Sequence, residues 1–424
     1  MLEQKIAELK KRKNAVILAH YYQDGEIQDI ADFIGDSLEL SKFAQRSNAE
    51  IIVFAGVKFM AEVAKILNPN AKVLVPDLLA GCSLEDSCKA QDLAKFKEKN
   101  PEHVVVSYIN CSSEVKALSD IICTSSNATK VIASIPPEKQ ILFAPDRFLG
   151  AYLEKITGRK MTLWNGSCVV HERFSEKELV KLKTQNADAK IIAHPECPES
   201  LLKYADFIGS TSKLLEYTKN HTGKFIVLTE NGIIHQMKKF SPHNEFLTVP
   251  YLEKDGVECI NCNSCEFMKL NTMEKIAMVL EKEINEIVMP ESLRLKAKTP
   301  LDKMLKLWCN TFQINWIHIN SSNEETILGR LLGDILRELQ YGNAIKGNDI
   351  SFKLRNYKGN YGVYSDKSAI GLLDIASNSK LKTSEFSQYV NNNFKFKKIR
   401  DDKKKQTFYI YFKRSNEPAL ANER

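Results

Sequence analysis

Long apolar runs are missing from the sequence, and none approaches the roughly 18 residues that a membrane-spanning helix needs. The N-terminus has no signal-peptide core and no small-residue cleavage site, so we expect a cytoplasmic protein without a membrane partner. The sequence contains neither the dinucleotide-binding pattern G-x-G-x-x-G after a strand nor the P-loop pattern G-x4-G-K-S/T. It therefore gives no support for binding of a dinucleotide cofactor or of ATP. With only 18 Gly and 13 Pro in 424 residues, a collagenous or low-complexity chain is excluded.

Net positive charge is missing outside the C-terminal part of the chain. Residues 308–424 contain 19 Lys and Arg against 12 Asp and Glu, and this excess equals the whole net charge of +7. Residues 1–307 are therefore neutral as a set. We expect a neutral body over residues 1–307 and a separate basic extension over residues 308–424.

The extension has the pattern of a small α+β module. We expect an amphipathic helix at 324–339, a short helix at 383–389 and a basic β-hairpin at 394–414. Helices followed by a basic hairpin are typical of a winged-helix-like module, which would bind nucleic acid through its phosphates. The interpretation that we favour is plainer: a solvated charged face on an interaction or stabilising domain.

A threefold repeat organises the first 265 residues. Three sets of residues recur at separations of 88 and 86, with one member in each repeat. The sets are His20, Tyr108 and His194; Asp32, Asp120 and Asp206; and Ser37, Ser125 and Thr211. In each repeat, short apolar runs alternate with helical patterns, which indicates βαβ units and parallel sheets.

The predicted fold class is α/β, with three pseudo-symmetric αβα sandwich units whose short parallel sheets surround a central site. The units span residues 1–82, completed by about 266–307, then 83–168 and 169–265. In parallel sheets, ligands bind outside the carboxyl ends of the strands. The repeated His, Tyr and Ser or Thr positions fall at those ends, so we expect them to share one site.

Ten cysteines in a cytoplasmic chain do not indicate a disulfide framework. The repeats end alike, in Cys82, in Cys168 and in one of Cys259, Cys262 and Cys265. Three converging thiolates would bind zinc, copper(I) or an iron–sulfur cluster, and a [4Fe–4S] cluster held by three cysteines leaves one iron open as a Lewis acid. Any single cysteine is more often a buried apolar side chain. The C-x2-C-x2-C run could also hold a metal alone or contain an oxidisable pair.

Several motifs occur in order over about residues 3–307, and together they resemble the quinolinate synthase family. They are His20-Tyr-Tyr-Gln23, Gly35-Asp-Ser37, Tyr108-Ile-Asn110, Cys123-Thr-Ser-Ser-Asn127, Asn165-Gly-Ser-Cys168, His194-Pro-Glu-Cys197, Gly209-Ser-Thr211 and the closing run from Cys265. The resemblance implies a [4Fe–4S] enzyme of NAD biosynthesis that condenses iminosuccinate with dihydroxyacetone phosphate. Quinolinate forms, and phosphate and water are released.

The resemblance also implies a ligand set and a partner. Cys265 becomes the third cluster ligand beside Cys82 and Cys168, while the roles of Cys259 and Cys262 stay open. An L-aspartate oxidase would supply the iminosuccinate. The alternative is an iron–sulfur sensor or regulator whose tail binds nucleic acid, but the intact substrate motifs favour the enzyme.

By the same resemblance, ten residues line the iminosuccinate site: His20, Ser37, Tyr108, Ile109, Asn110, Ser125, His194, Pro195, Glu196 and Thr211. Glu196 is the best candidate for the general base, because a carboxylate at a strand end near a metal has little structural purpose. His20, His194, Tyr22 and Tyr108 could carry or donate protons, although each alone is as readily a structural side chain.

Hydroxyl groups are expected where each repeat opens a helix. Ser37, Ser125 and Thr211 could bind a carboxylate or phosphate there, together with free backbone N–H groups. The alternative for any one of them is a plain N-cap. Their recurrence beside the His and Tyr positions favours binding.

Overall fold

The computed structural model of the protein describes residues 2–252, 258–259 and 263–308, and beyond them six strands between residues 312 and 414. The chain divides into two compact units, residues 1–304 and residues 305–424. No helix among the described residues is long and apolar enough to cross a membrane.

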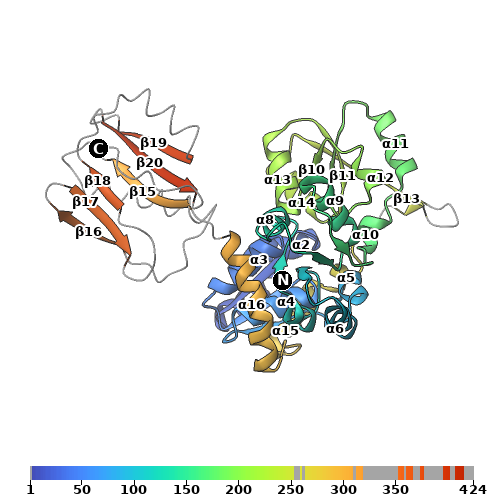
Figure 1. Ribbon diagram of the computed structural model, residues 1–424, viewed down its shortest axis with the longest axis horizontal. Helices are drawn as coiled ribbons and strands as arrows, with labels where there is room; N and C mark the ends of the chain where they lie inside the picture. Colours follow the sequence, from blue (N-terminus) through green and yellow to red (C-terminus); the bar gives the residue numbers. More distant parts are fainter. Residues whose placement is uncertain are drawn as a thin grey trace. The chain divides into compact units, whose positions relative to one another are not determined.

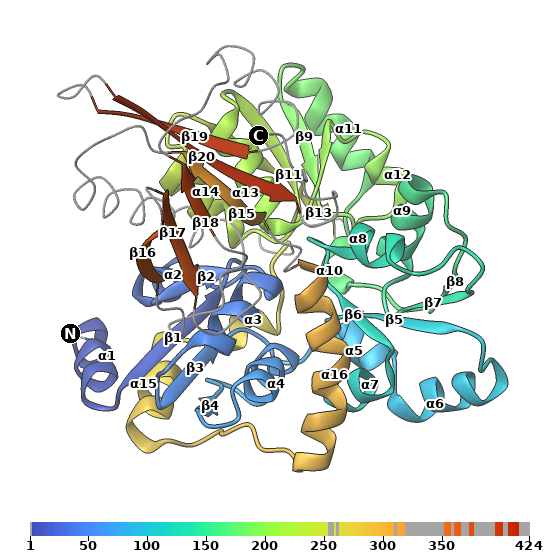
Figure 2. The same ribbon diagram turned by 60° about the vertical axis from the view of Figure 1, so that its left-hand side comes forward.

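Three four-stranded parallel sheets form the first unit, and the strands of each follow the same spatial order. In spatial order they are β2 (Phe33–Gly35), β1 (Ala15–His20), β3 (Ile51–Ala55) and β4 (Lys72–Leu74); β6 (Ile121–Cys123), β5 (Val104–Tyr108), β7 (Ile141–Ala144) and β8 (Thr162–Leu163); and β10 (Phe207–Ile208), β9 (Lys190–Ala193), β11 (Lys224–Leu228) and β12 (Glu245–Thr248). Figure 1 labels β10 and β11 of the third sheet, and Figure 2 labels strands of all three sheets, which differ in colour. The predicted α/β class with short parallel sheets is confirmed.

The recurrent aspartates attach the edge strand to the central strand of each sheet. Asp32 Oδ2 accepts the backbone N–H of Ile17 at 2.7 Å, and its own N–H donates to the Ile17 carbonyl at 2.9 Å. Asp120 and Asp206 make the same pair of bonds to the central strands of their own repeats. Each carboxylate thus satisfies a strand N–H that the short edge strand would leave unpaired.

Helices follow the strands and cover the sheets. They are α1 (Leu2–Arg12), α2 (Gly25–Ile30), α3 (Ser37–Arg46), α4 (Lys58–Leu67), α5 (Ser83–Ser87), α6 (Ala90–Lys99), α7 (Ser113–Leu118), α8 (Ala128–Ala133), α9 (Arg147–Thr157), α10 (Val169–Glu172), α11 (Glu176–Gln185), α12 (Glu199–Leu202), α13 (Thr211–Asn220), α14 (Ile233–Phe240), the 3-10 turn Met268–Leu270, α15 (Met273–Lys282) and α16 (Glu291–Trp308). A short antiparallel pair, β13 (Tyr251–Leu252) and β14 (Glu258–Cys259), follows the third sheet.

The first sheet is buried on both faces. Ile17 and Val53 pack with residues of α1 and α15 in one apolar cluster, so the first helix of the chain lies beside a helix that follows the third repeat (Figure 2). Leu18 and Phe54 alternate to the opposite face and are also buried. A continuous apolar strand is what a parallel sheet between two helical layers requires.

The second unit contains a six-stranded sheet in the order β16 (Phe352–Tyr357), β17 (Asn360–Ser365), β18 (Leu373–Ala376), β15 (Phe312–His318), β20 (Gln406–Arg414) and β19 (Lys395–Asp401). Strands β19 and β20 pair antiparallel in the segment where the sequence predicts a basic β-hairpin. The helices predicted at 324–339 and 383–389 lie outside the described residues. The winged-helix-like assignment stays a prediction.

The loop that leads to Cys168 is packed closely against the second repeat. The N–H of Gly166 donates to the Pro145 carbonyl at 3.0 Å, and a Cβ atom at Gly166 would lie 2.5 Å from that oxygen. The same Cβ would also overlap Oγ of Ser87. Only glycine fits this position without displacing backbone atoms.

Replacement of Gly166 by Ala should therefore lower the free energy of unfolding by about 1–3 kcal/mol, because the methyl group must displace a carbonyl. Gly81→Ala is the matched control, since its Cβ would meet its nearest atoms at 3.7 Å, an ordinary contact. Urea unfolding of both variants measures the difference. Equal stability of the two variants would contradict the close packing at Gly166.

Candidate active site

A pocket with about 650 Å³ of empty space, open solvent at its mouth included, lies where strands of all three sheets end. Twelve of the residues singled out from the sequence line it: His20, Tyr22, Ser37, Cys82, Tyr108, Asn110, Ser125, Cys168, His194, Glu196, Thr211 and Cys265. Ile109 and Pro195 are buried without being among the lining residues. The common edge of parallel strands thus gathers side chains from positions 20 to 265.

Asp36 joins the three repeats at the floor of the pocket. It caps α3, and its Oδ1 accepts the N–H groups of Leu38 and Glu39, each at 3.0 Å. Its Oδ2 accepts the hydroxyls of Ser126 at 2.6 Å and of Ser212 at 2.7 Å, which come from the second and third repeats. One carboxylate therefore fixes the spacing of three helix starts.

The three repeated hydroxyl residues stand beside this junction, and none of them is the N-cap itself. Ser37 and Thr211 are the first residues of α3 and α13, whose caps are Asp36 and Ser210. Ser125 precedes α8 by a short turn and lies 3.2 Å from Nε2 of His194. With the caps supplied by other residues, these hydroxyls face the pocket as potential donors to an anion.

His20 and His194 occupy equivalent positions and have equivalent bonds. Nδ1 of His20 accepts the N–H of Tyr22 at 3.2 Å, and Nδ1 of His194 accepts the N–H of Glu196 at 3.4 Å. Burial lowers the pKa of both imidazoles to about 4, against the opposing effect of Asp36 and Glu196. Both rings are therefore neutral at physiological pH and carry the proton on Nε2, which makes them donors without a charge.

Glu196 is a buried carboxylate between a phenol and an imidazole. Tyr108 donates to its Oε1 at 2.5 Å, and Nδ1 of His171 lies 3.0 Å from its Oε2. Burial alone would raise the pKa of Glu196, but His194 and His171, with the bonds from His171 and Tyr108, lower the pKa to about 2. The carboxylate is ionised and able to accept a proton.

A hydrogen-bonded chain continues from His171 to the other tyrosine of the pocket. Nε2 of His171 lies 2.9 Å from Oγ1 of Thr229, which lies 2.7 Å from the hydroxyl of Tyr22. Thr211 Oγ1 is 3.2 Å from the same hydroxyl. Burial raises the pKa of Tyr22 well above its usual value, so this phenol stays protonated. The chain offers a path for protons between the two sides of the pocket.

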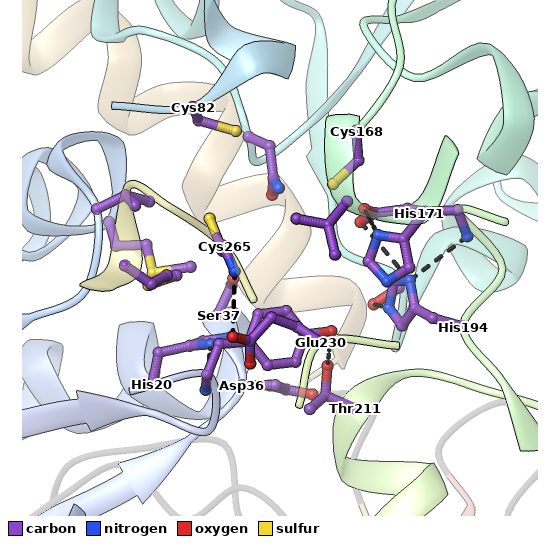
Figure 3. A pocket seen from close by; sticks show the side chains of 18 of the residues that line it. His20, Asp36, Ser37, Cys82, Cys168, His171, His194, Thr211, Glu230 and Cys265 are labelled. Atoms are coloured by element: carbon purple, nitrogen blue, oxygen red, sulfur yellow. Dashed lines mark hydrogen bonds and ion pairs between the residues drawn. The ribbon is translucent and has the colours of Figure 1, made fainter. Parts of the chain in front are cut away.

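Three thiols face one space in the upper part of the pocket. Figure 3 shows the sulfur atoms of Cys82, Cys168 and Cys265 turned toward one another. These three are partly exposed, whereas the other described cysteines (Cys88, Cys111, Cys123 and Cys197) are buried. Burial raises the pKa of all three thiols, to about 11 for Cys265, and neighbouring negative charge adds to the rise. A cationic inorganic core would compensate three thiolates, so the donor set fits an iron–sulfur cluster.

A second group of possible metal ligands shares one of these thiols. The ligand atoms of Cys168, His171 and Glu196 lie within 4.8 Å of one another and could hold a metal ion. Sulfur, imidazole and carboxylate ligands suit zinc. Because both arrangements use Cys168, they exclude each other.

Ten lining residues are not among the predicted site residues, and four of them are Asp36, His171, Glu230 and Met268. Glu230 could have been found, since it is a charged residue close after the apolar run 225–228 of the third repeat. Asp36 stands where the other repeats have Thr124 and Ser210, and His171 stands where the first repeat has Glu85, so the repeat does not single them out. Cys262 and the side chain of Cys259 lie outside the described residues.

Comparison with known proteins assigns the family. A family model described as "Quinolinate synthetase A protein" matches residues 4–306. The chain belongs to the quinolinate synthase family. A quinolinate synthase of Prochlorococcus marinus (strain MIT 9303) is 57% identical over 303 residues, which cover 71% of this chain and 90% of that protein. A quinolinate synthase of Ehrlichia chaffeensis is 57% identical over 307 residues, or 72% of this chain and 97% of that protein.

Within this quinolinate synthase fold, Asp36→Ala should lower the free energy of unfolding by about 2–4 kcal/mol, because it removes a helix cap and two bonds to other repeats. Ser212→Ala removes only one of those bonds and should cost about 1 kcal/mol. Urea unfolding of both variants tests this order. If Asp36→Ala and Ser212→Ala were equally stable, the claim that Asp36 links the three repeats would be contradicted.

Proposed function

We propose that the protein is a quinolinate synthase that condenses iminosuccinate with dihydroxyacetone phosphate, releasing phosphate and water, in NAD biosynthesis. The observation that carries the proposal is the pocket, in which three thiols, anion-binding hydroxyls and an ionised carboxylate meet in a chain of this family. An L-aspartate oxidase is the partner that we expect to supply iminosuccinate.

Both substrates are anions, and the pocket supports anion binding without a fixed positive charge. Ser37 and Thr211 begin two ten-residue helices whose N-termini favour carboxylate or phosphate groups. The neutral imidazoles of His20 and His194 add N–H donors. We assign the dicarboxylate to these groups, with Asn110 and Tyr108 as further hydrogen-bonding partners on the side of the second repeat.

Cys82, Cys168 and Cys265 would hold a [4Fe–4S] cluster with one open iron. That iron would supply Lewis-acid chemistry that polarises substrate oxygen or nitrogen and promotes loss of water. The thiols come from three different repeats, so a cluster would also tie the repeats together. This assignment gives Cys168 to the cluster rather than to a zinc ion.

The protein's own groups would move the protons. Glu196 would take a proton from substrate carbon on a carboxylate oxygen and, still accepting from Nδ1 of His171 3.0 Å away, could return that proton to a later intermediate. The protonated hydroxyl of Tyr22 would donate to a developing enolate or carbonyl oxygen, and that of Tyr108 would do so once Glu196 has taken up a proton and no longer accepts from it. Thr229 would hydrogen-bond to both Tyr22 and His171 and so hold these two side chains in a fixed relative position.

The direct test is an anaerobic assay of the purified, cluster-reconstituted protein with iminosuccinate and dihydroxyacetone phosphate. Quinolinate should appear with equimolar phosphate. A cluster-loaded protein that makes no quinolinate would overturn the proposed activity, and it would favour the alternative role as an iron–sulfur sensor.

Replacement of Cys82, Cys168 or Cys265 by Ala should remove most of the bound iron and sulfide, since each variant lacks one of three ligands. Cys88→Ala is the matched control, because Cys88 is 1% exposed and packs in an apolar cluster. Iron and sulfide analysis after anaerobic purification gives the comparison. Full cluster content in Cys265→Ala would remove this residue from the ligand set.

Replacement of Glu196 by Gln keeps the shape of the side chain and removes the base. Turnover should fall by at least about a hundredfold, while cluster content stays that of the unmodified protein. Glu178→Gln serves as control, since Glu178 is another buried carboxylate and does not line the pocket. Unchanged turnover of Glu196→Gln would exclude it from the chemistry.

A further inference from the structure

Glu230 is a buried carboxylate that the proposed proton path does not use. It follows β11 and is 0% exposed. Its Oε1 accepts the N–H of Cys265 at 3.2 Å, and its Oε2 accepts the N–H of Gly232 at 2.6 Å (Figure 3 shows Glu230 beside Cys265). A carboxylate of the third repeat thus holds the main chain of the third cysteine in place.

Lys269 completes the arrangement one turn after Cys265. The N–H of Lys269 donates to the carbonyl of Cys265 at 3.1 Å, so the two residues belong to one turn. Its ammonium lies 3.4 Å from Oε1 of Glu230 and 2.9 Å from Oδ1 of Asp24. Removal of either partner from such a largely buried pair leaves an uncompensated charge.

The same ammonium reaches the loop that carries Tyr22. Nζ of Lys269 donates to the Tyr22 carbonyl at 3.0 Å. On the other side, a Cβ atom at Gly232 would lie 2.8 Å from Cα of Tyr22, so the two backbones are in direct contact. The loop of Glu230 and Gly232 therefore abuts both the Cys265 turn and the Tyr22 loop.

We propose that Glu230 and Lys269 are positioning residues that hold Cys265 ready to bind the cluster and couple that position to Tyr22. The inference rests on the proposed function, since it assumes that Cys265 is a cluster ligand. The groups that hold a metal ligand in place commonly change metal affinity by roughly 10–100-fold when they are replaced. Neither residue is required to touch the substrate.

The test measures anaerobic release of iron to a chelator from the reconstituted full-length protein. Glu230→Ala should release iron at least about tenfold faster than the unmodified protein, and the isosteric Glu230→Gln should fall between them. Glu178→Ala, which removes a buried carboxylate outside the pocket, should release iron at the unmodified rate. Thermal unfolding of every variant identifies a general loss of fold, and Glu230→Gln keeps the test valid if Glu230→Ala does not fold.

Substitution at Lys269 tests the coupling to Tyr22. Lys269→Met should accelerate iron release and raise the KM for iminosuccinate several-fold, because the Tyr22 carbonyl and Glu230 both lose their partner. Lys269→Arg keeps the charge and should restore both values toward those of the unmodified protein. Faster iron release with an unchanged KM would overturn the coupling.

Two results separate this inference from the proposed function. If the unmodified protein holds a cluster and Glu230→Ala releases iron at the same rate, the positioning role is wrong and the proposed function stands. If the unmodified protein holds no cluster after reconstitution, the proposed function fails and the inference fails with it.

Discussion

The carboxylate of Asp36 bonds to all three repeats, and the geometry of the pocket depends on it. Each repeat folds its own parallel sheet, so nothing within a repeat determines how the three strand ends meet. Two serine hydroxyls from the second and third repeats converge on Oδ2, and the cap of α3 occupies Oδ1. Since the hydroxyls of the pocket lie at these helix starts, the shared acceptor contributes to their separation, together with the bonds of Tyr108 to Glu196 and of Tyr22 to Thr211.

Charge is the second constraint on the pocket. Burial disfavours ionised groups, and it keeps His20 and His194 neutral and the cysteine thiols protonated. Glu196 is the exception, because its hydrogen bonds and neighbouring imidazoles hold it ionised. An anionic substrate would then meet neutral donors and one base, while the thiols would ionise only when a cationic core binds. Substrate binding and cluster binding can thus share one buried space.

The sequence predicts the sheets and most of the pocket because both follow the repeat. The spacing of 88 and 86 residues places His20, Ser37 and their equivalents at matching strand and helix ends, where the structure has them. Asp36 was missed because its partners Ser126 and Ser212 belong to other repeats, and His171 was missed because its partners Glu196 and Thr229 lie far along the chain. The spacing of Asp32 and its equivalents is visible in the sequence, but their bonds to the central strand are a property of the folded sheet.

The central claim is that three cysteines from three repeats hold one cubane with a vacant iron. A crystal structure of the anaerobically purified protein, with diffraction data collected at the iron absorption edge, tests it most directly. We expect a four-iron cluster bound by Cys82, Cys168 and Cys265, one cysteine to each of three irons, with the fourth iron free of protein ligands. A single ion bound by Cys168, His171 and Glu196, with Cys82 and Cys265 unligated, would contradict the claim.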